Sequence, residues 1–301
     1  MPPRELNDVL DFSVVDESED WIVVDKPAPL QIHPSKPGGP PTLWHGLRAL
    51  LAYDLANGAA LSIINRLDRE TSGLVLIAKN PASARAINKA MMRREIRKEY
   101  AALVSGWPEL DEWTTEAPIL RRGDVEDSPI YLMQKVHPDG APCLTHFRVL
   151  ERFTAETTAG NKFALVAAVP HTGRMHQIRV HLHHSGFPVV GDKLYGPDPQ
   201  WYLEQIRHGW TPEAAAALLF PRQALHSAVL GLTLPDQEPL LWRAPLPAEW
   251  LARFPMLKAP AGENASVQPN RNPGDSRQVS TRGQDWSILN NDAASVRPQR
   301  G

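Results

Sequence analysis

The sequence lacks features that define several classes of protein. Among its 301 residues there is one cysteine, Cys143, which excludes an internal disulfide framework and fits a reducing compartment. The amino terminus has neither the basic start nor the apolar segment of a signal peptide. No run approaches the roughly 20 apolar residues that cross a bilayer. We therefore expect a cytoplasmic protein without a membrane segment.

Net charge is also small, but it is unevenly distributed. The formal total of −2 gives no global indication of nucleic-acid binding. Residues 1–25 hold eight acidic side chains against Arg4, a net charge of −7, which leaves +5 for the remainder. Such asymmetry allows a basic working surface beside an acidic edge.

Composition divides the chain into three parts. Residues 259–301 are rich in Pro, Gly, Asn, Ser and Arg, and their few apolar residues share no period. Burial cannot offset chain entropy in such a segment, so we expect a disordered tail. Residues 1–19 are expected to form an acidic extension, and residues 20–258 a single domain.

Short apolar runs and a few helical patterns alternate within that domain. Helices are predicted from Pro81 to about Lys98, between Met175 and Gly186, and from Pro212 onward. Strands are predicted at 21–25, 74–78, 101–106, 163–169 and 228–234. Because the alternation is irregular, we predict an α+β fold with a mixed, mainly antiparallel sheet, flanking helices and a central catalytic cleft.

A charged loop between two strand-like runs is the densest polar feature. The segment SIINRLDRETSGLVLIAK, residues 62–79, places Arg66, Asp68, Arg69 and Glu70 where a plain hairpin would carry Asn-Gly or Asp-Gly. This indicates a functional loop centred on Asp68. An aspartic protease would need two Asp-Thr-Gly or Asp-Ser-Gly loops, and the single ETSG excludes that class.

Basic residues recur at intervals of four on the first predicted helix. Arg85, Lys89, Arg93 and Arg97 would form a stripe about 18 Å long if helical. A solvated helix face remains an alternative, but one sign of charge suits a phosphate backbone. Tyr100 follows the stripe, either as a core aromatic or as a stacking surface for an exposed base.

Five histidines fall between positions 171 and 184 and suggest a metal site. The set is His171, His176, His181, His183 and His184. The spacing lacks the His-Glu-x-x-His element, so no metal is predicted. On the predicted helix, Arg179 shares a face with His176 and His183, which can present it to a cleft.

Together these segments resemble the pseudouridine synthases of the RluA type, which isomerise uridine to pseudouridine in structured RNA. The resemblance follows six segments in order: 23–34, 65–79, 97–106, 139–152, 171–196 and 221–232. Many relatives also have an RNA-binding S4 domain, for which the chain before these segments is too short, so we expect a stand-alone catalytic domain that acts on rRNA or tRNA. The resemblance also implies that no cofactor is needed, and we expect a monomer.

The resemblance implies roles for individual residues. Asp68 matches the catalytic aspartate, Tyr100 the aromatic packed on the target base, and Arg179 the arginine paired with the aspartate. Arg66 matches a residue that fills the gap left by a flipped nucleotide. Asn65 stands where the family usually has His. The other expected RNA or uridine contacts are Thr71, Gly73, Arg174, His176, Gln177, Leu225, Arg85, Lys89, Arg93 and Arg97.

The implied reaction moves uracil from an N1 to a C5 linkage without redox change. It needs an ionised carboxylate as nucleophile or base, and Arg179 would stabilise that charge. Whether the carboxylate attacks C1′, attacks the ring or removes a ribose proton stays open. Two other classes also stay open: a non-catalytic RNA-binding factor and a histidine-metal hydrolase.

Overall fold

The computed structural model describes residues 11–235 and 237–257, which belong to one unit. Its strands are β1 (Ser13–Glu17), β2 (Trp21–Lys26), β3 (Ser62–Ile63), β4 (Ser72–Ala78), β5 (Ile96–Ser105), β6 (Glu112–Glu116), β7 (Ile119–Arg121), β8 (Gln134–Val136), β9 (Leu144–Thr157), β10 (Gly160–Pro170), β11 (Leu225–Leu232) and β12 (Leu240–Arg243). Its helices are α2 (Leu43–Leu50), α3 (Ala52–Ala56), α4 (Pro81–Met92), α5 (Gln177–His184), α6 (Gln200–His208), α7 (Pro212–Leu218) and α8 (Ala248–Arg253), with a short 3-10 helix at Arg122–Asp124.

Within these described residues, ten strands form one sheet. Its order is β1-β2-β4-β11-β5-β10-β9-β6, with β12 on β11 and β3 on β4, and β7 pairs separately with β8. Only the β4–β11 pair of this sheet is parallel. The predicted α+β class with a mainly antiparallel sheet is therefore confirmed. The five predicted strands fall largely in β2, β4, β5, β10 and β11.

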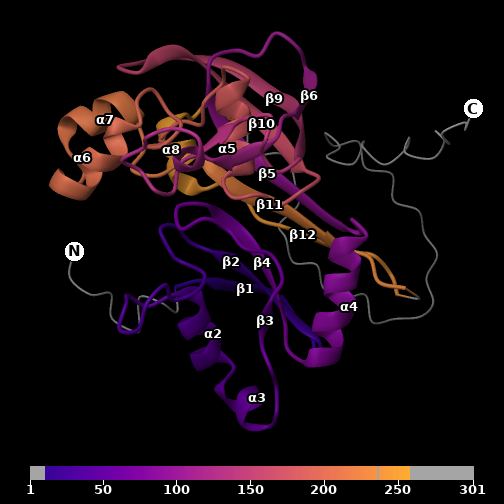
Figure 1. Cartoon of the computed structure of the whole chain (residues 1–301). Coiled ribbons are helices and arrows are strands. Elements are labelled where there is room, and N and C mark those ends of the chain that lie inside the picture. Colours follow the sequence, from indigo (N-terminus) through magenta and orange to yellow (C-terminus); the bar gives the residue numbers. More distant parts are fainter. Residues whose placement is uncertain (1–10, 236, 258–301) are drawn as a thin grey trace, which may run out of the picture. The chain divides into compact units, whose positions relative to one another are not determined.

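The helices are attached to different parts of the sheet (Figure 1). Near β1–β4 lie α2, α3 and α4, whereas α5 packs against β8, β9 and β10. Helix α4 buries Ile87 in an apolar cluster that includes Leu74 and Leu76 of β4. Asn80 caps α4 as predicted, because its side-chain oxygen accepts from two backbone amides of the first turn. This anchoring places the end of α4 at the start of β5.

The predicted extent of α4 is wrong. The helix ends at Met92 rather than near Lys98, and Arg94 has a left-handed φ of 62°. Ile96 then begins β5, where it pairs with Leu232 and joins the same apolar cluster as Ile87. Burial of Ile96 on the sheet requires extended backbone, so the four-residue spacing of basic residues continues past the helix only by coincidence.

The remaining expectations concern the helix ends and the termini. Thr211 caps α7 as predicted, and α5 begins after His176, which has a φ of 57°. Strand β1 lies inside the segment expected to precede the domain and pairs with β2. The tail predicted at 259–301 lies outside the described residues. Across 11–235 and 237–257, no helix is both long and apolar enough to cross a membrane.

Candidate active site

The loop between β3 and β4 carries Asp68 and is fixed from the side of β2. Lys26 is fully buried at the end of β2 and donates to the carbonyl oxygens of Leu30 at 2.9 Å and Arg69 at 3.4 Å. The amide of Leu30 also donates to the carbonyl of Arg69 at 2.9 Å. Several bonds to one short segment restrict its conformations, which positions the backbone next to Asp68.

The opposite side of the loop is held by charged residues from distant segments. Lys193 pairs with the Glu70 carboxylate at 2.8 Å, and Arg222 donates to the Glu70 carbonyl at 3.2 Å. Asn65 donates to the Leu74 carbonyl at 3.0 Å and accepts from the Leu76 amide at 2.8 Å. The side-chain amide of Asn65 therefore supplies a supporting contact to β4.

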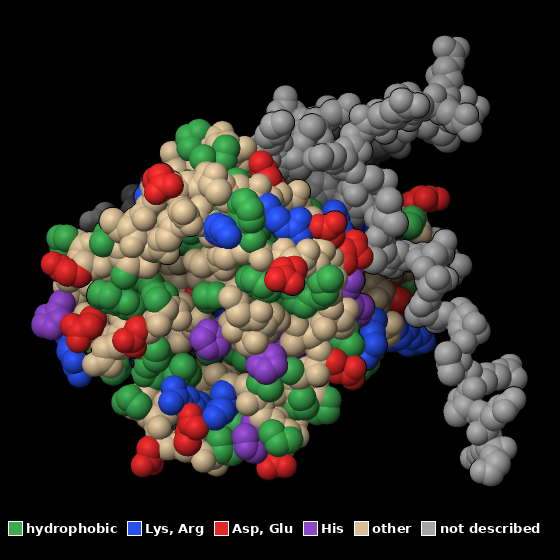
Figure 2. Space-filling model, turned by 90° about the horizontal axis from the view of Figure 1, so that it is seen from above, with side chains coloured by type: hydrophobic (Ala, Val, Ile, Leu, Met, Phe, Trp, Pro, Cys, Tyr) green, Lys and Arg blue, Asp and Glu red, His purple; other side chains and the backbone are tan. Residues whose placement is uncertain are grey.

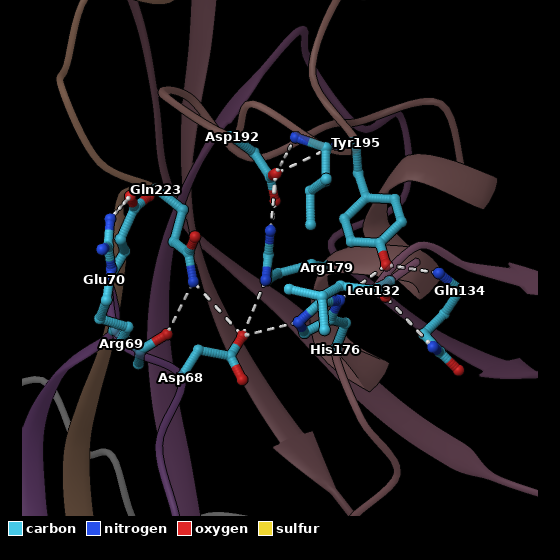
Figure 3. A network of polar contacts seen from close by, with 12 residues as sticks. Asp68, Arg69, Glu70, Leu132, Gln134, His176, Arg179, Asp192, Tyr195 and Gln223 are labelled. Atoms are coloured by element: carbon cyan, nitrogen blue, oxygen red, sulfur yellow. Dashed lines mark hydrogen bonds and ion pairs between the residues drawn. The ribbon is translucent and has the colours of Figure 1, made fainter. Parts of the chain in front are cut away.

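Asp68 is held through one carboxylate oxygen (Figure 3). Its Oδ2 accepts from Arg179 Nη1 at 2.8 Å and from Gln223 Nε2 at 3.4 Å, and His176 Nε2 lies 4.0 Å away. Its Oδ1 has no hydrogen-bond partner among the described residues. The side chain is 32% exposed. One oxygen is thus fixed while the other remains available.

Arg179 is positioned by a second aspartate. Its Nε and Nη2 donate to the two oxygens of the buried Asp192, at 2.7 and 2.9 Å. Asp192 Oδ1 also accepts from the amides of Leu194 and Tyr195. Burial opposes both charges, but their mutual attraction raises the pKa of Arg179 and lowers the pKa of Asp192. The guanidinium therefore stays charged and aimed at Asp68.

His176 faces Asp68 as a neutral ring. Burial, followed by the charge of Arg179, lowers the pKa of His176 to about 4. Its Nδ1 lies 2.8 Å from the Tyr195 hydroxyl oxygen. That oxygen accepts a hydrogen bond from the backbone N–H of Gln134 at 2.9 Å. Because Nε2 faces the Asp68 carboxylate, which can only accept, we assign the ring proton to Nε2, and the Tyr195 hydroxyl then donates to Nδ1.

Tyr100 lies in the middle of the sheet close to this network. In β5 it pairs with Ser227 of β11 and Ala168 of β10. Burial, followed by the negative charge of Asp68, raises the pKa of Tyr100, so the phenol remains protonated. Gly73 has a φ of 107°, and a Cβ there would lie 2.3 Å from the Ser227 carbonyl oxygen. Only glycine permits this close approach of β4 to β11.

Two further predicted residues are committed to other contacts. Gln177 is buried, and its amide bonds with Thr172 and Thr145 and with the backbone of Arg174 and Leu144. All of its hydrogen-bonding positions are therefore occupied. Thr71, also buried, accepts from Gln223 at 3.0 Å and so supports the residue that contacts Asp68.

The other predicted contacts are dispersed. Arg66, Arg85, Lys89 and Arg174 are exposed, whereas Leu225 is buried in β11. The predicted basic stripe is wrong beyond Lys89, because α4 ends at Met92, before Arg93 and Arg97. Arg93 lies 4.0 Å from Glu95, and Arg97, on β5, lies 2.9 Å from Glu99.

Sequence reasoning missed several residues of the network. Asp192, Tyr195, Gln223 and Lys26 were not singled out, although the segment GFPVVGDKLYG contains an acidic residue within an apolar run. That lone acid is a usable signal, because buried carboxylates need a partner. Gly191, just before it, has a φ of 77° and leaves no room for a Cβ beside the Arg222 carbonyl.

Comparison with known proteins agrees with this arrangement. Residues 20–184 match the family described as RNA pseudouridylate synthase. "Ribosomal large subunit pseudouridine synthase D" of Nitrosomonas europaea is 37% identical over 260 residues, covering 83% of this chain and 67% of that protein. The Pseudomonas aeruginosa protein of the same name is 35% identical over 257 residues, covering 83% and 72%. The solved structure of human RNA pseudouridylate synthase domain containing 1 has a TM-score of 0.59 and 27% identity, covering 81% and 86%. The chain therefore belongs to the RluA-type RNA pseudouridine synthases, enzymes that isomerise uridine to pseudouridine.

Proposed function

We propose that this enzyme modifies a uridine of large-subunit ribosomal RNA with Asp68 as its catalytic carboxylate. The two bacterial relatives named above support that RNA as the target. One observation carries the role of Asp68: Arg179 binds its Oδ2, whereas its Oδ1 has no partner among the described residues. The single cysteine fits the reducing cytoplasm.

The chemistry needs one reactive oxygen in a fixed position. In the reaction the N1–C1′ bond breaks, a C5–C1′ bond forms, the hydrogen on C5 leaves as a proton, and N1 takes up a proton in place of its bond to C1′. Oδ1 would act at C1′, at the pyrimidine ring or on a ribose proton. Arg179 keeps the negative charge on Asp68 and holds the carboxylate plane, so little reorganisation is needed when the substrate arrives.

The uridine must leave its stack to reach Asp68. Unstacking and unpairing cost a few kcal/mol, and stacking on Tyr100 would return about 1–3 kcal/mol. Arg66 is exposed on the same loop as Asp68 and would fill the gap in the RNA. Because the terms are similar in size, the target is expected in a loop or imperfect stem, where unpairing costs least.

Replacement of Asp68 by Asn tests this role. Asp68→Asn keeps the shape that contacts Arg179 but removes the charge, so tritium release from 5-tritiated large-subunit RNA should fall at least about a thousandfold. Binding of the RNA should change little. Glu156→Gln removes an exposed carboxylate on β9 and serves as the matched control.

Three results would count against the proposal. Near-normal tritium release by Asp68→Asn would remove Asp68 from the chemistry. Binding without any release by the wild type would favour a non-catalytic RNA-binding factor. Loss of activity on chelation, with RNA folding controlled, would point to the metal hydrolase.

A further inference from the structure

Positive side chains without carboxylate partners gather where α4 meets β5. Lys98 is half-buried on β5, two residues before Tyr100 and therefore on the same face of the sheet. Ala168 of β10 pairs with Tyr100, and His171 follows the end of β10, which brings its ring toward Lys98. Arg94 stands at the turn that ends α4. These three residues are called the α4–β5 cluster below.

The cluster is electrostatically unfavourable by itself. Burial lowers the pKa of Lys98, and no carboxylate offsets this. Burial, followed by the charge of Arg94, lowers the pKa of His171, and Lys98 and His146 add to the effect. None of the three side chains has a hydrogen bond or ion pair with the described residues. The positive charges therefore repel one another without compensation.

Basic residues next to the cluster do have carboxylates nearby. Arg97 pairs with Glu99 at 2.9 Å, and Arg93 lies 4.0 Å from Glu95. At the edge of the cluster, the Glu112 carboxylate lies 3.7 Å from the His146 ring. On the face in Figure 2, Lys and Arg side chains are likewise interspersed with Asp and Glu. Two positive groups, Lys98 and Arg94, that lack a carboxylate partner and lie beside the His171 imidazole differ from this ordinary surface.

The position of the cluster indicates which anion would fit. Two residues along a strand span about 7 Å, so Lys98 lies about that far from Tyr100 along β5. A base stacked on Tyr100 would bring its own strand's phosphates to the same end of β5. A half-buried ammonium flanked by a guanidinium and an imidazole supplies donors for phosphate oxygens.

We propose that Arg94, Lys98 and His171 bind one backbone phosphate of the RNA beside the everted uridine. This inference rests on the proposed function, since it takes RNA as the substrate. The bound phosphate would relieve the repulsion in the cluster, and it would fix the strand regardless of sequence.

The experiment measures how RNA binding depends on salt. Lys98→Gln removes the charge and keeps a polar side chain that is one methylene shorter. With a short fluorescent oligouridylate as probe, the slope of log K against log salt should fall by about 0.7 to 1, and Kd should rise several-fold at low salt. Arg94→Gln, at an exposed position, should do the same. Lys98→Arg should restore most of the slope.

Lys162→Gln is the matched control. Lys162 is near the start of β10, about 30 Å along the strand from His171, and lies over the Trp107 ring. The same loss of charge there should leave the slope unchanged. In tritium-release assays the defect of Lys98→Gln should appear in KM for RNA.

The outcomes separate this inference from the proposed function. Unchanged slopes for both Lys98→Gln and Arg94→Gln in an active enzyme would overturn the phosphate site and leave the function standing. An equal decrease for Lys162→Gln would also overturn it, because the effect would then be one of net charge. A wild type that neither binds the probe nor releases tritium would overturn the proposed function itself.

Discussion

Positive side chains in two parts of the same domain differ in how fully they are paired with carboxylates. Arg179 has each of its three donor nitrogens paired with Asp68 or Asp192. Lys98 and Arg94 have no such partner among the described residues. The first arrangement is complete before substrate arrives and fixes a catalytic oxygen. The second is incomplete and gains its counter-charge from the ligand. The difference separates a charge that positions another group from a charge that binds.

The largest effect is expected when the pair of Arg179 and Asp192 is broken. Asp192→Asn leaves the buried Arg179 without its full counter-charge, and the free energy of unfolding should fall by about 3–5 kcal/mol in urea titrations. Isomerisation should fall with it, because Arg179 no longer aims at Asp68. Asp139→Asn changes a carboxylate that is 85% exposed and should cost no more than about 0.5 kcal/mol. A loss below about 1 kcal/mol for Asp192→Asn would show that the pair does not anchor the site.

The next largest effect is the pH dependence of stability that follows from the low pKa of His176, which lies beside Asp68 and Arg179. Its pKa is about 4 in the folded protein against 6.5 ordinarily. As pH falls below 6.5, His176 takes up a proton in the unfolded chain, whereas in the folded protein it stays neutral until about pH 4. The wild type therefore loses stability between these two pH values. Urea titrations at pH 7 and pH 4.5 should show a loss about 2–3 kcal/mol larger for the wild type than for His176→Gln. Equal losses would mean that the ring is not held neutral.

The smallest effect on stability comes from the exposed face of α4. Reversing Arg85 and Lys89 to Glu should change the free energy of unfolding by no more than about 0.5 kcal/mol, while RNA binding weakens and its salt dependence flattens. Arg207→Glu on α6, where the arginine is 57% exposed beside Glu204, is the control. An unchanged salt slope would place the RNA away from α4.

The strands were predictable because burial on a sheet leaves a local pattern. β4 is buried at each of its seven positions, and its sequence SGLVLIA shows this directly. The start of α4 was equally visible in Asn80 and Pro81. Its end was not, since basic residues keep a spacing of four through Arg97 while Ile96 is drawn into the sheet. Periodicity of surface charge does not report which backbone lies beneath it.

The site shows a similar division. The loop around Asp68 was visible from its density of charge, but its partner Arg179 is 111 positions away and was identified by family resemblance. Gln223 is 155 positions from Asp68 and was missed. Such pairings depend on how β4, β11 and α5 meet, and no local pattern encodes them. Asp192 was also missed, although its position as a lone acid within an apolar run was a usable local signal.

The most direct test of the account is a crystal structure with RNA carrying 5-fluorouridine at the target position. Fluorine on C5 prevents the final loss of a proton, so the nucleoside should stay in the site. The account predicts that Asp68 Oδ1 lies within about 3.5 Å of the nucleoside, with the base against Tyr100 and Oδ2 still on Arg179. A nucleoside bound elsewhere would contradict it, as would a nucleoside that contacts Oδ2 while the hydrogen bond between Arg179 and Oδ2 is broken.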